Sequence, residues 1–332
     1  MRSNPEPLKG VADLGELFLD LTISIATYGR PQLLEQTLRS CLAQRNRLGL
    51  GIEILVTDNH PDGAGLAVAR AVAAEAPLPI RWQADLTRNM STLRNAGIAA
   101  ARGAMIAFID DDEIADPDWT DQLVGALREA DADIAVGLRA AVFAESAPAY
   151  DPEGESFVRR LDVEAGALVR LMREDGKPLH GLGTGNSLFK MATCFPNPRA
   201  FDEAFGDAGG EDAELMVRLY KQGRRIVWAP KARVVETVPP HRTLAAYRLV
   251  RAKREAQHYF NIYVAHAPRP ARAAAVLRLK GLLQVAAGVV IATAGFEFGS
   301  ERRLRGRLLI ANGVGKLTNR QVGYIQEPSL AA

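Results

Sequence analysis

Four acidic side chains directly follow an apolar run in the middle of the chain. Residues 104–109 read AMIAFI, and Asp110, Asp111, Asp112 and Glu113 come next. At an effective dielectric near 20, two like charges about 4 Å apart repel by roughly 4 kcal/mol. Two explanations stay open. The run is a solvated turn that caps a following helix, or it binds Mg²⁺ or Mn²⁺ together with a phosphorylated ligand, since these cations take carboxylate and phosphate oxygens.

The elements before this run predict a sheet edge that would hold it. We expect strands over 21–27, 51–59, 79–85 and 104–110, separated by helices over 31–44, 66–75 and 91–103. Strands that alternate with such helices indicate βαβ units and a mainly parallel sheet. Thr27, Asp58 and Asp110 all fall at the carboxyl ends of these strands, where α/β sheets bind ligands.

The second half of the chain is less regular. It predicts a helix over 121–129, a strand over 132–143, an acidic and then helical stretch over 145–178, a glycine-rich loop over 181–186, a helix from about 211 to 222, and a strand pair over 224–241. The loop GLGTGN would either let the backbone approach an acceptor or form a plain tight turn. Its GxGxG spacing, far from the first strand, is not a dinucleotide fingerprint.

Composition is that of an ordinary globular protein, and the charge is unevenly spread. The chain has 332 residues and a formal net charge of +2, yet 241–320 contain 15 Lys/Arg against 3 Asp/Glu. Cys41 and Cys194 cannot form a disulfide framework, and no Cys/His spacing suggests zinc. We expect a reducing, cytoplasmic location, and the first 21 residues show no signal-peptide pattern.

The basic C-terminal region favours a membrane surface as its partner. Residues 281–296 carry no charge, but 16 residues are fewer than the roughly 20 needed to span a bilayer. We expect a buried or interfacially docked helix, with spanning as the less favoured alternative. Nucleic-acid binding would need stacking aromatics among the arginines, and these aromatics are scattered. They are Tyr247, Tyr259, Phe260 and Tyr263.

Several motifs together resemble family 2 glycosyltransferases. TISIATYGRPQLLEQTLRSCLAQ, EILVTDN, RNAGIAAARGAMIAFIDDDE and GGEDAELMVRL occur in the family's order, over about two thirds of the chain. DNH, RNAG and FIDDDE followed by DW are particularly similar to bacterial succinoglycan-type exopolysaccharide enzymes. The resemblance implies one α/β glycosyltransferase-A (Rossmann-like) domain with a C-terminal helical basic extension. The expected divisions are an extension over 1–20, a nucleotide-sugar half over 21–119, an acceptor half over 120–241 and the basic region over 242–332.

The resemblance also assigns roles on the donor side. The donor-binding positions are Thr27, Tyr28, Arg30, Asp58, Arg94, Asn95, Asp110 and Asp111. Asp58 would accept a hydrogen bond from the base, commonly uracil, and Arg94 or Asn95 would lie near the diphosphate. Asp112, Asp110 and His241 would ligate Mn²⁺ or Mg²⁺, although the DDDE pattern leaves open which carboxylate does so. A loop residue without a metal role is the alternative for His241.

The resemblance makes Asp212 the general base, which inverting transfer needs to deprotonate the acceptor hydroxyl. Glu211 and Asp212 could instead only cap the helix that they begin. The acceptor-side positions are Gly185, Asn186, Glu211 and Trp119, with core packing as the alternative for Trp119.

The sequence therefore predicts a metal-dependent inverting glycosyltransferase with a nucleotide-diphosphate donor, most commonly a UDP-sugar. Its acceptor would be a saccharide, polyprenyl-diphosphate-linked, in exopolysaccharide or cell-surface polysaccharide synthesis at the cytoplasmic face of the inner membrane. Two alternatives remain. A sugar-phosphate nucleotidyltransferase would need a glycine-rich basic loop after the first strand, which TYGRP matches poorly. A non-catalytic nucleotide- or saccharide-binding protein would not need Asp110, Asp112 and Asp212 together.

Overall fold

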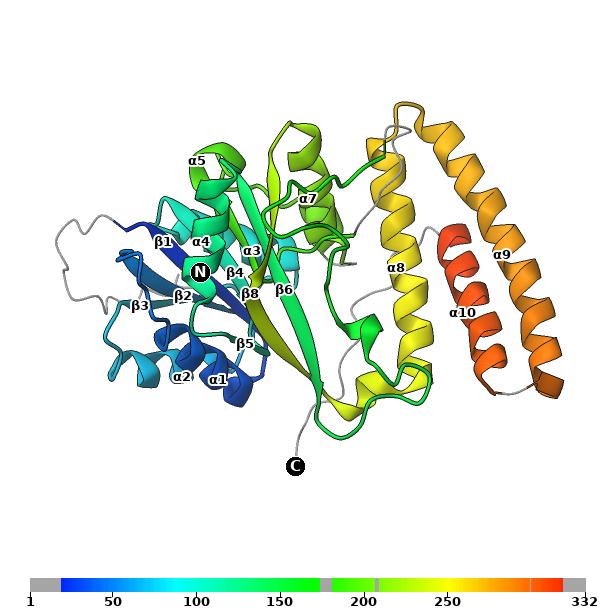
Figure 1. The fold of residues 1–332 in the computed structure, drawn as a ribbon, viewed down its shortest axis with the longest axis horizontal. Helices are drawn as coiled ribbons and strands as arrows, with labels where there is room; N and C mark the ends of the chain where they lie inside the picture. Colours follow the sequence, from blue (N-terminus) through cyan, green and yellow to red (C-terminus); the bar gives the residue numbers. More distant parts are fainter. Residues whose placement is uncertain (1–18, 174–180, 207–208, 299, 319–332) are drawn as a thin grey trace, which may run out of the picture.

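The fold is built on a curled mixed sheet (Figure 1). The computed structural model describes residues 19–173, 181–206, 209–298 and 300–318. Within them the strands run in the order β3-β2-β1-β4-β7-β6-β8-β5. Their bounds are β1 Leu21–Thr27, β2 Ile52–Asp58, β3 Ile80–Ala84, β4 Met105–Asp110, β5 Glu113–Ala115, β6 Ile134–Phe143, β7 Ser187–Lys190 and β8 Ile226–Val238. Most pairings are parallel, and β7 and β5 join antiparallel. The predicted α/β fold, with a mainly parallel central sheet and a C-terminal helical extension, is confirmed.

The helices cover both faces of this sheet, and those at the C-terminal end of the chain extend beyond its edge (Figure 1). They are α1 Pro31–Leu42, α2 Ala64–Ala73, α3 Met90–Ala100, α4 Trp119–Glu129, α5 Met191–Cys194, α6 Glu203–Gly206, α7 Glu211–Lys221, α8 Ala245–His266, α9 Pro270–Phe298 and α10 Ser300–Leu317. Pro31 begins α1, where no backbone N–H is needed. The Asn89 side chain caps α3 by accepting from the Thr92 N–H at 3.1 Å.

Two hydrophobic clusters fill the space between the sheet and the helices. Along β4, Ala107 and Ile109 belong to one cluster, and Ile106 and Phe108 to the other. Successive side chains of a strand point to opposite faces, so each cluster fills one face. A central strand buried on both faces in this way reads as an unbroken apolar run, which is the pattern of residues 104–109.

Two sequence expectations about the second half were wrong. The strand pair expected over 224–241 is one strand, β8. Its pairing with β6 shifts after Ala229 and resumes at Arg233, so that Pro230, which cannot donate to a ladder, lies in the irregularity. The stretch expected to be helical, 145–178, contains over its described part, 145–173, only a 3₁₀ turn, η1 (Glu155–Phe157), and isolated bridges. Residues 174–180 lie outside the described residues.

The C-terminal helices stand at one side of the sheet domain. In Figure 1, α8 lies nearest the sheet, and α9 and α10 form an antiparallel pair beyond it. Between β8 and α8 a 3₁₀ turn, η2 (Pro240–Thr243), carries His241 and Arg242. This turn brings the chain that follows β8 back to the acidic run, where Arg242 contacts Asp112.

Candidate active site

The predicted ligand-binding edge is present in the sheet. Thr27 pairs with Asp58 across β1 and β2, and Asp110 ends β4 opposite Ala26 of β1. The three predicted positions therefore lie at one edge of the parallel part of the sheet.

The chain's own cations and donors hold the acidic run in place. The buried Asp111 accepts from the Thr27 hydroxyl at 2.7 Å and from Arg30 Nη1 at 3.2 Å. The same Arg30 nitrogen lies 3.0 Å from Asp112 Oδ2. The Thr37 hydroxyl of α1 lies 3.0 Å from the Asp111 carbonyl oxygen. Arg30 thus bridges two of the four carboxylates.

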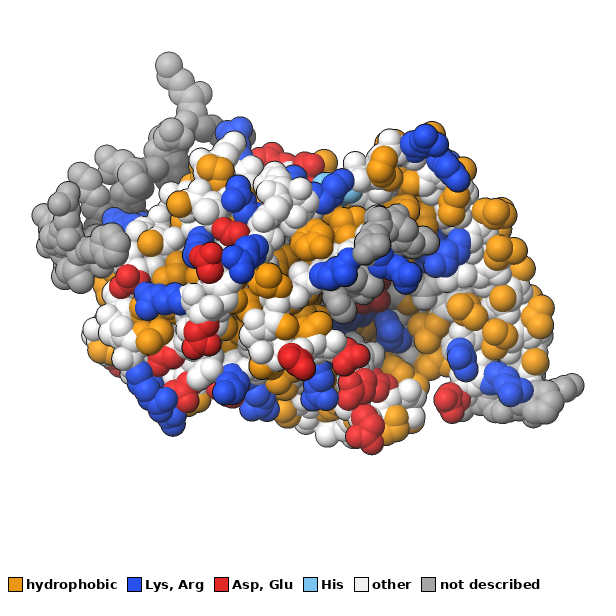
Figure 2. All heavy atoms as spheres, turned by 45° about the horizontal axis from the view of Figure 1, so that its top comes forward, with side chains coloured by type: hydrophobic (Ala, Val, Ile, Leu, Met, Phe, Trp, Pro, Cys, Tyr) orange, Lys and Arg blue, Asp and Glu red, His pale blue; other side chains and the backbone are white. Residues whose placement is uncertain are grey.

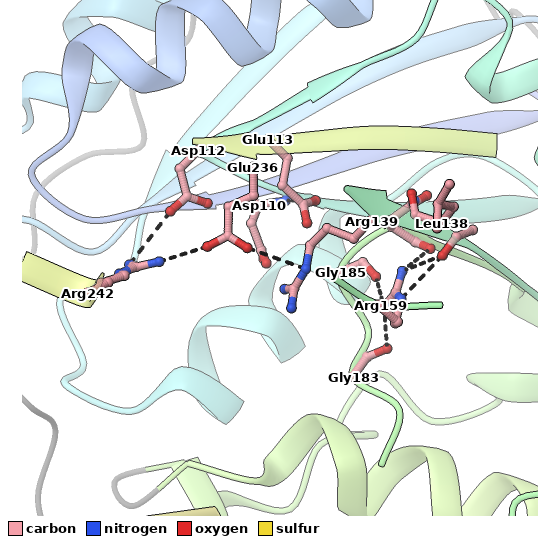
Figure 3. A network of polar contacts seen from close by, with 12 residues as sticks. Asp110, Asp112, Glu113, Leu138, Arg139, Arg159, Gly183, Gly185, Glu236 and Arg242 are labelled. Atoms are coloured by element: carbon pink, nitrogen blue, oxygen red, sulfur yellow. Dashed lines mark hydrogen bonds and ion pairs between the residues drawn. The ribbon is translucent and has the colours of Figure 1, made fainter. Parts of the chain in front are cut away.

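A second group of charged side chains lies beneath the run (Figure 3). Arg242 contacts Asp112 at 3.7 Å and Glu236 at 2.8 Å, and the Nε atom of Arg139 lies 3.3 Å from Glu236 Oε2. Glu113 accepts from the Asp110 N–H at 3.1 Å, while its Oε1 atom is buried without a hydrogen-bond partner among the described residues. The acidic run is therefore one edge of a network that crosses β4, β5, β6 and β8.

Burial and mutual repulsion raise the pKa values of the carboxyl groups in this cluster. Burial, and then the charges of Glu236 and Asp110, raise the pKa of Asp112 to about 7. Burial also raises the pKa of Asp111, although Arg30 opposes the shift. Burial and the charge of Asp110 raise the pKa of Glu113 well above its usual value. Within the described residues, no hydrogen bond or ion pair reaches the Asp110 carboxylate. The arrangement favours a further cation.

The glycine-rich loop lies between Asp110 and Asp212. A Cβ atom on Gly185 would lie 2.8 Å from Asp110 Oδ2, and a Cβ atom on Gly183 would lie 2.3 Å from Asp212 Oδ2. Neither position has room for a side chain. The two carboxylates predicted to bind the donor and to act as the base thus flank the same three residues.

Arg159 fixes the path of this loop. Its partly buried guanidinium donates to the carbonyl oxygens of Gly185 at 2.6 Å and Asn186 at 2.9 Å, to Gly183 at 3.3 Å, and to Gly137 of β6. Burial, and then the charge of Arg139, lower the pKa of Arg159 to about 10. Figure 3 shows the guanidinium facing the loop carbonyls.

Asp212 lies in the first turn of α7. Its Oδ1 atom accepts from the Ala213 N–H at 2.7 Å, so the carboxylate takes part in capping, and its Oδ2 atom is the one that borders Gly183. The neighbouring Glu211 is buried and paired with Arg94. Burial raises the pKa of Glu211 to about 7, and Arg94 opposes that shift.

Other predicted donor residues are engaged in local contacts. Asp58 is fully buried and accepts from the backbone N–H groups of His60, Gly65 and Leu66. Tyr28 is exposed and packs edge-on against the His60 ring. Their contacts with a donor remain predictions.

Arg94 and Asn95, the predicted diphosphate-side pair, both contact the segment around Phe201. The Arg94 guanidinium lies 5.5 Å from the centre of the Phe201 ring, in addition to its pairing with Glu211. The Asn95 amide is buried and exchanges two hydrogen bonds with the Phe201 backbone. Asn95 therefore positions a loop here, and a diphosphate contact by either residue remains a prediction.

Two predicted acceptor-side side chains are in the core. Trp119 and Asn186 are both 0% exposed, and the Trp119 Nε1 atom donates to Asn186 Oδ1 at 2.7 Å. The Asn186 amide donates in turn to the carbonyls of Leu138 and Ala232. These side chains have no atom available to an acceptor in this structure, so the packing alternative describes Trp119 better. The backbone of Asn186 and Gly185 still forms the loop beside Asp110.

The three predicted metal ligands do not form a ready-made cage. Within the described residues, no group of three or more His, Cys, Asp or Glu side chains is placed to hold an ion. His241 packs against the Tyr247 ring, with its buried Nε2 atom lacking a hydrogen-bond partner in the described part. The next residue, Arg242, contacts Asp112 at 3.7 Å, in addition to the contact that Arg30 makes with the same carboxylate. The trio of Asp110, Asp112 and His241 remains a prediction.

The sequence analysis missed the buried network itself. Its unpredicted members are Arg139, Arg159, Glu236 and Arg242. Arg242 had one available signal, its position next to His241 after two prolines. Glu236 carries the acidic side chain of β8 and directly follows two valines, where a charged residue is unusual if the segment is buried. Arg139 and Arg159 carry no such signal, because their role depends on contacts far away in the sequence.

Comparisons with known proteins show the family of the chain. The sequence profile of the family described as glycosyl transferase family 2 matches residues 22–194. Succinoglycan biosynthesis protein ExoM of Rhizobium meliloti (strain 1021) is 29% identical over 239 residues, which cover 72% of this chain and 74% of that protein.

Two solved structures share the fold. Mannosyltransferase PcManGT from Pyrobaculum calidifontis, in complex with GDP-Man and Mn²⁺, superposes with a TM-score of 0.57 at 19% identity, covering 93% of this chain and 91% of that one. S. aureus TarS 1–349 in complex with UDP-GlcNAc gives a TM-score of 0.53 at 15% identity, covering 90% and 82%. With a family profile that spans just over half of its residues, the chain belongs to glycosyl transferase family 2 and is a glycosyltransferase.

Proposed function

We propose that this glycosyltransferase moves a sugar from a nucleotide-diphosphate donor to a saccharide acceptor, with inversion and with the help of a divalent cation. One observation carries the proposal: Asp110 and Asp212 border opposite ends of the Gly183–Gly185 segment. A donor held beside Asp110 and an acceptor hydroxyl held beside Asp212 would then meet across this loop. Inversion needs such a base on the face of the sugar opposite the leaving group.

The carboxylates of the acidic run could hold a divalent cation together with the phosphates of a bound donor. Mg²⁺ is commonly held by one or two protein carboxylates together with substrate phosphates, so a three-ligand cage is not required. Asp110 and Asp112 would hold it, with His241 as a further candidate. A bound Mn²⁺ or Mg²⁺ would stabilise the negative charge of the departing diphosphate. Burial raises the pKa values of Asp111 and Asp112, and a bound cation would oppose those shifts as Arg30 already does.

Two observations support the choice of donor nucleotide: the base that is commonest in the family, and the nucleotide-sugars bound in the two similar solved structures. One neighbour binds GDP-Man and the other UDP-GlcNAc, and we propose a UDP-sugar first. Tyr28 and Arg30 lie after β1 on the side of the acidic run, where they would contact the nucleotide. The name of ExoM supports a role in exopolysaccharide synthesis. From the basic C-terminal region we further propose a lipid-linked acceptor at the cytoplasmic face of the membrane.

The donor site is tested by calorimetric titration of UDP, GDP and CDP with and without Mn²⁺. We expect one nucleotide to bind in a Mn²⁺-dependent manner, with affinity reduced about tenfold or more in Asp112→Asn. Asp162→Asn serves as the matched control, because Asp162 is exposed and no hydrogen bond or ion pair of its carboxylate is described in the structure. If no nucleotide binds under either condition, the donor proposal fails.

The base is tested separately on the same preparations. Asp212→Asn should lower kcat by about 10²–10⁴-fold, the usual contribution of a general base, while donor affinity changes less than about threefold. A variant that transfers sugar at the wild-type rate would leave Asp212 with its capping role alone. Product anomeric configuration, read by NMR, decides whether transfer inverts.

A further inference from the structure

The helix α9 leaves a long apolar face uncovered. Its exposed large apolar side chains are Val276, Leu279, Leu282, Leu283, Val289 and Val290, with exposed fractions of 47–67%. From Val276 to Val290 there are 14 residue steps, or about 21 Å of helix. Figure 2 shows apolar side chains spread over this side of the molecule, with Lys and Arg side chains among and beside them. Contiguous exposed apolar surface of this extent marks an interaction site.

The opposite face of α9 is closed by glycine contacts with α10. A Cβ atom on Gly288 would lie 2.7 Å from the Gly306 carbonyl oxygen, and one on Gly313 would lie 2.5 Å from the Gly281 carbonyl oxygen. At Gly315, a Cβ atom would lie 2.4 Å from a carbonyl oxygen of α8. The helix pair is therefore packed backbone to backbone and attached to α8. Its uncovered apolar face points away from the rest of the protein.

The charges around this face are almost all positive. The basic residues of α9 and α10 are Arg272, Arg278, Lys280, Arg302, Arg303, Arg305, Arg307 and Lys316, against Glu297 and Glu301. An open groove of about 590 Å³ lies between the two helices, and Arg302 and Arg305 line it together with apolar side chains such as Val290 and Leu309. Apolar walls beside guanidinium groups suit the acyl chains and phosphate of an anionic lipid.

We propose that the α9 face and this groove dock on an anionic phospholipid bilayer, with α9 and α10 lying along the membrane plane. By length and composition alone, Pro270–Ala294 is apolar enough to span a membrane, with a mean hydropathy of 1.7. However, Gly288 in the middle of α9 contacts Gly306 of α10, and exposed Arg305 and Arg307 flank that glycine. Spanning would carry these arginines to the bilayer centre, where charge is costly. Docking in the plane keeps them at the headgroups.

This surface does not depend on the identity of the donor, and vesicle binding tests it. Vesicles of phosphatidylglycerol and phosphatidylcholine in equal parts are floated with the full chain, beside vesicles of phosphatidylcholine alone. We expect binding to the anionic vesicles that weakens with salt. Leu279→Ser with Leu283→Ser should lower the partition coefficient about tenfold or more. Arg302→Gln with Arg305→Gln should lower it severalfold. Leu48→Ser, an exposed leucine on another part of the molecule, is the matched control and should bind as the wild type does.

Four results would overturn the proposal. They are equal binding of the double-leucine variant, no wild-type binding to anionic vesicles, resistance of the bound protein to alkaline extraction, and a wild-type dimer in solution that dissociates in the double-leucine variant. The third would mean spanning, and the fourth an interface between copies of the chain. Nucleotide titration of the same variants without vesicles measures the donor site alone. It therefore distinguishes a failure of the membrane proposal from a failure of the donor proposal.

Discussion

Replacement of Arg159 by methionine should destabilise the protein and impair transfer together. Arg159 is partly buried and donates five hydrogen bonds to four backbone carbonyls, three of them in the loop between Asp110 and Asp212. Methionine keeps most of the length of the side chain and removes all five donors. The loop would then lose the contacts that keep it between the two carboxylates.

The size of the effect follows from the groups left without partners. A buried carbonyl deprived of its donor costs about 1–3 kcal/mol, and four such costs are an upper bound because the loop relaxes and water enters. Removal of one member of a buried charged network typically costs about 3–5 kcal/mol. We therefore expect about 3–5 kcal/mol, which is at least a fifth of the roughly 5–15 kcal/mol that stabilise an ordinary domain.

Urea unfolding measures this loss. With a slope of about 3 kcal/mol per molar urea, the midpoint should fall by about 1–2 M. Arg160→Met is the matched control, because the neighbouring Arg160 is exposed and makes no contact described for it in the structure, and it should change stability by less than about 0.5 kcal/mol. If Arg159→Met unfolds with the same midpoint as Arg160→Met, the loop does not depend on this guanidinium and the reasoning is refuted.

Three further substitutions test other parts of the structure. Gly183→Ala would place a Cβ atom 2.3 Å from Asp212 Oδ2, so transfer should fall at least about tenfold in a steady-state assay while nucleotide binding by calorimetry is kept. Glu214→Gln should reduce the acid lability of the fold. Burial alone would raise the Glu214 pKa, but hydrogen bonds from His266 and Arg218 lower it overall, so its contribution is present above about pH 4.5 and is lost as pH falls through the lower folded pKa. Thermal scans at pH 3–7 would show a smaller loss in the variant, and an identical loss would contradict this. Gly306→Leu would separate α9 from α10 and lower helicity by circular dichroism; an unchanged spectrum and melting temperature would contradict that close packing.

The first half of the fold could be predicted from the sequence because its signals are local. The strands β1, β2 and β4 are apolar runs of ordinary length, and α1 has Pro31 in its first turn and apolar residues at helical spacing. The positions of Thr27, Asp58 and Asp110 followed from one rule about parallel sheets, which the observed register satisfies.

The second half was harder because its structure depends on distant partners. The strand β8 reads as two strands, since Pro230 interrupts the pattern, and only the pairing with β6 joins them. Glu113 reads as part of a polar turn, although it begins β5 and is buried against that distant strand. For Trp119 the sequence leaves a sugar contact and core packing open, because the acceptor of its Nε1 hydrogen, Asn186, lies 67 residues later.

The charge balance of the site predicts that donor binding requires a divalent cation. The ionisable groups of the network are the carboxylates Asp110, Asp111, Asp112, Glu113 and Glu236 and the guanidinium groups Arg30, Arg139, Arg159 and Arg242. With all of them ionised, the carboxylates exceed the cations by one, and a nucleotide diphosphate would add more negative charge. Because Arg159 is committed to the loop carbonyls, it contributes little to such a ligand. A donor that bound equally well without a divalent cation would therefore require Arg30 or Arg242 to leave its carboxylates, and burial would then penalise the charges left behind.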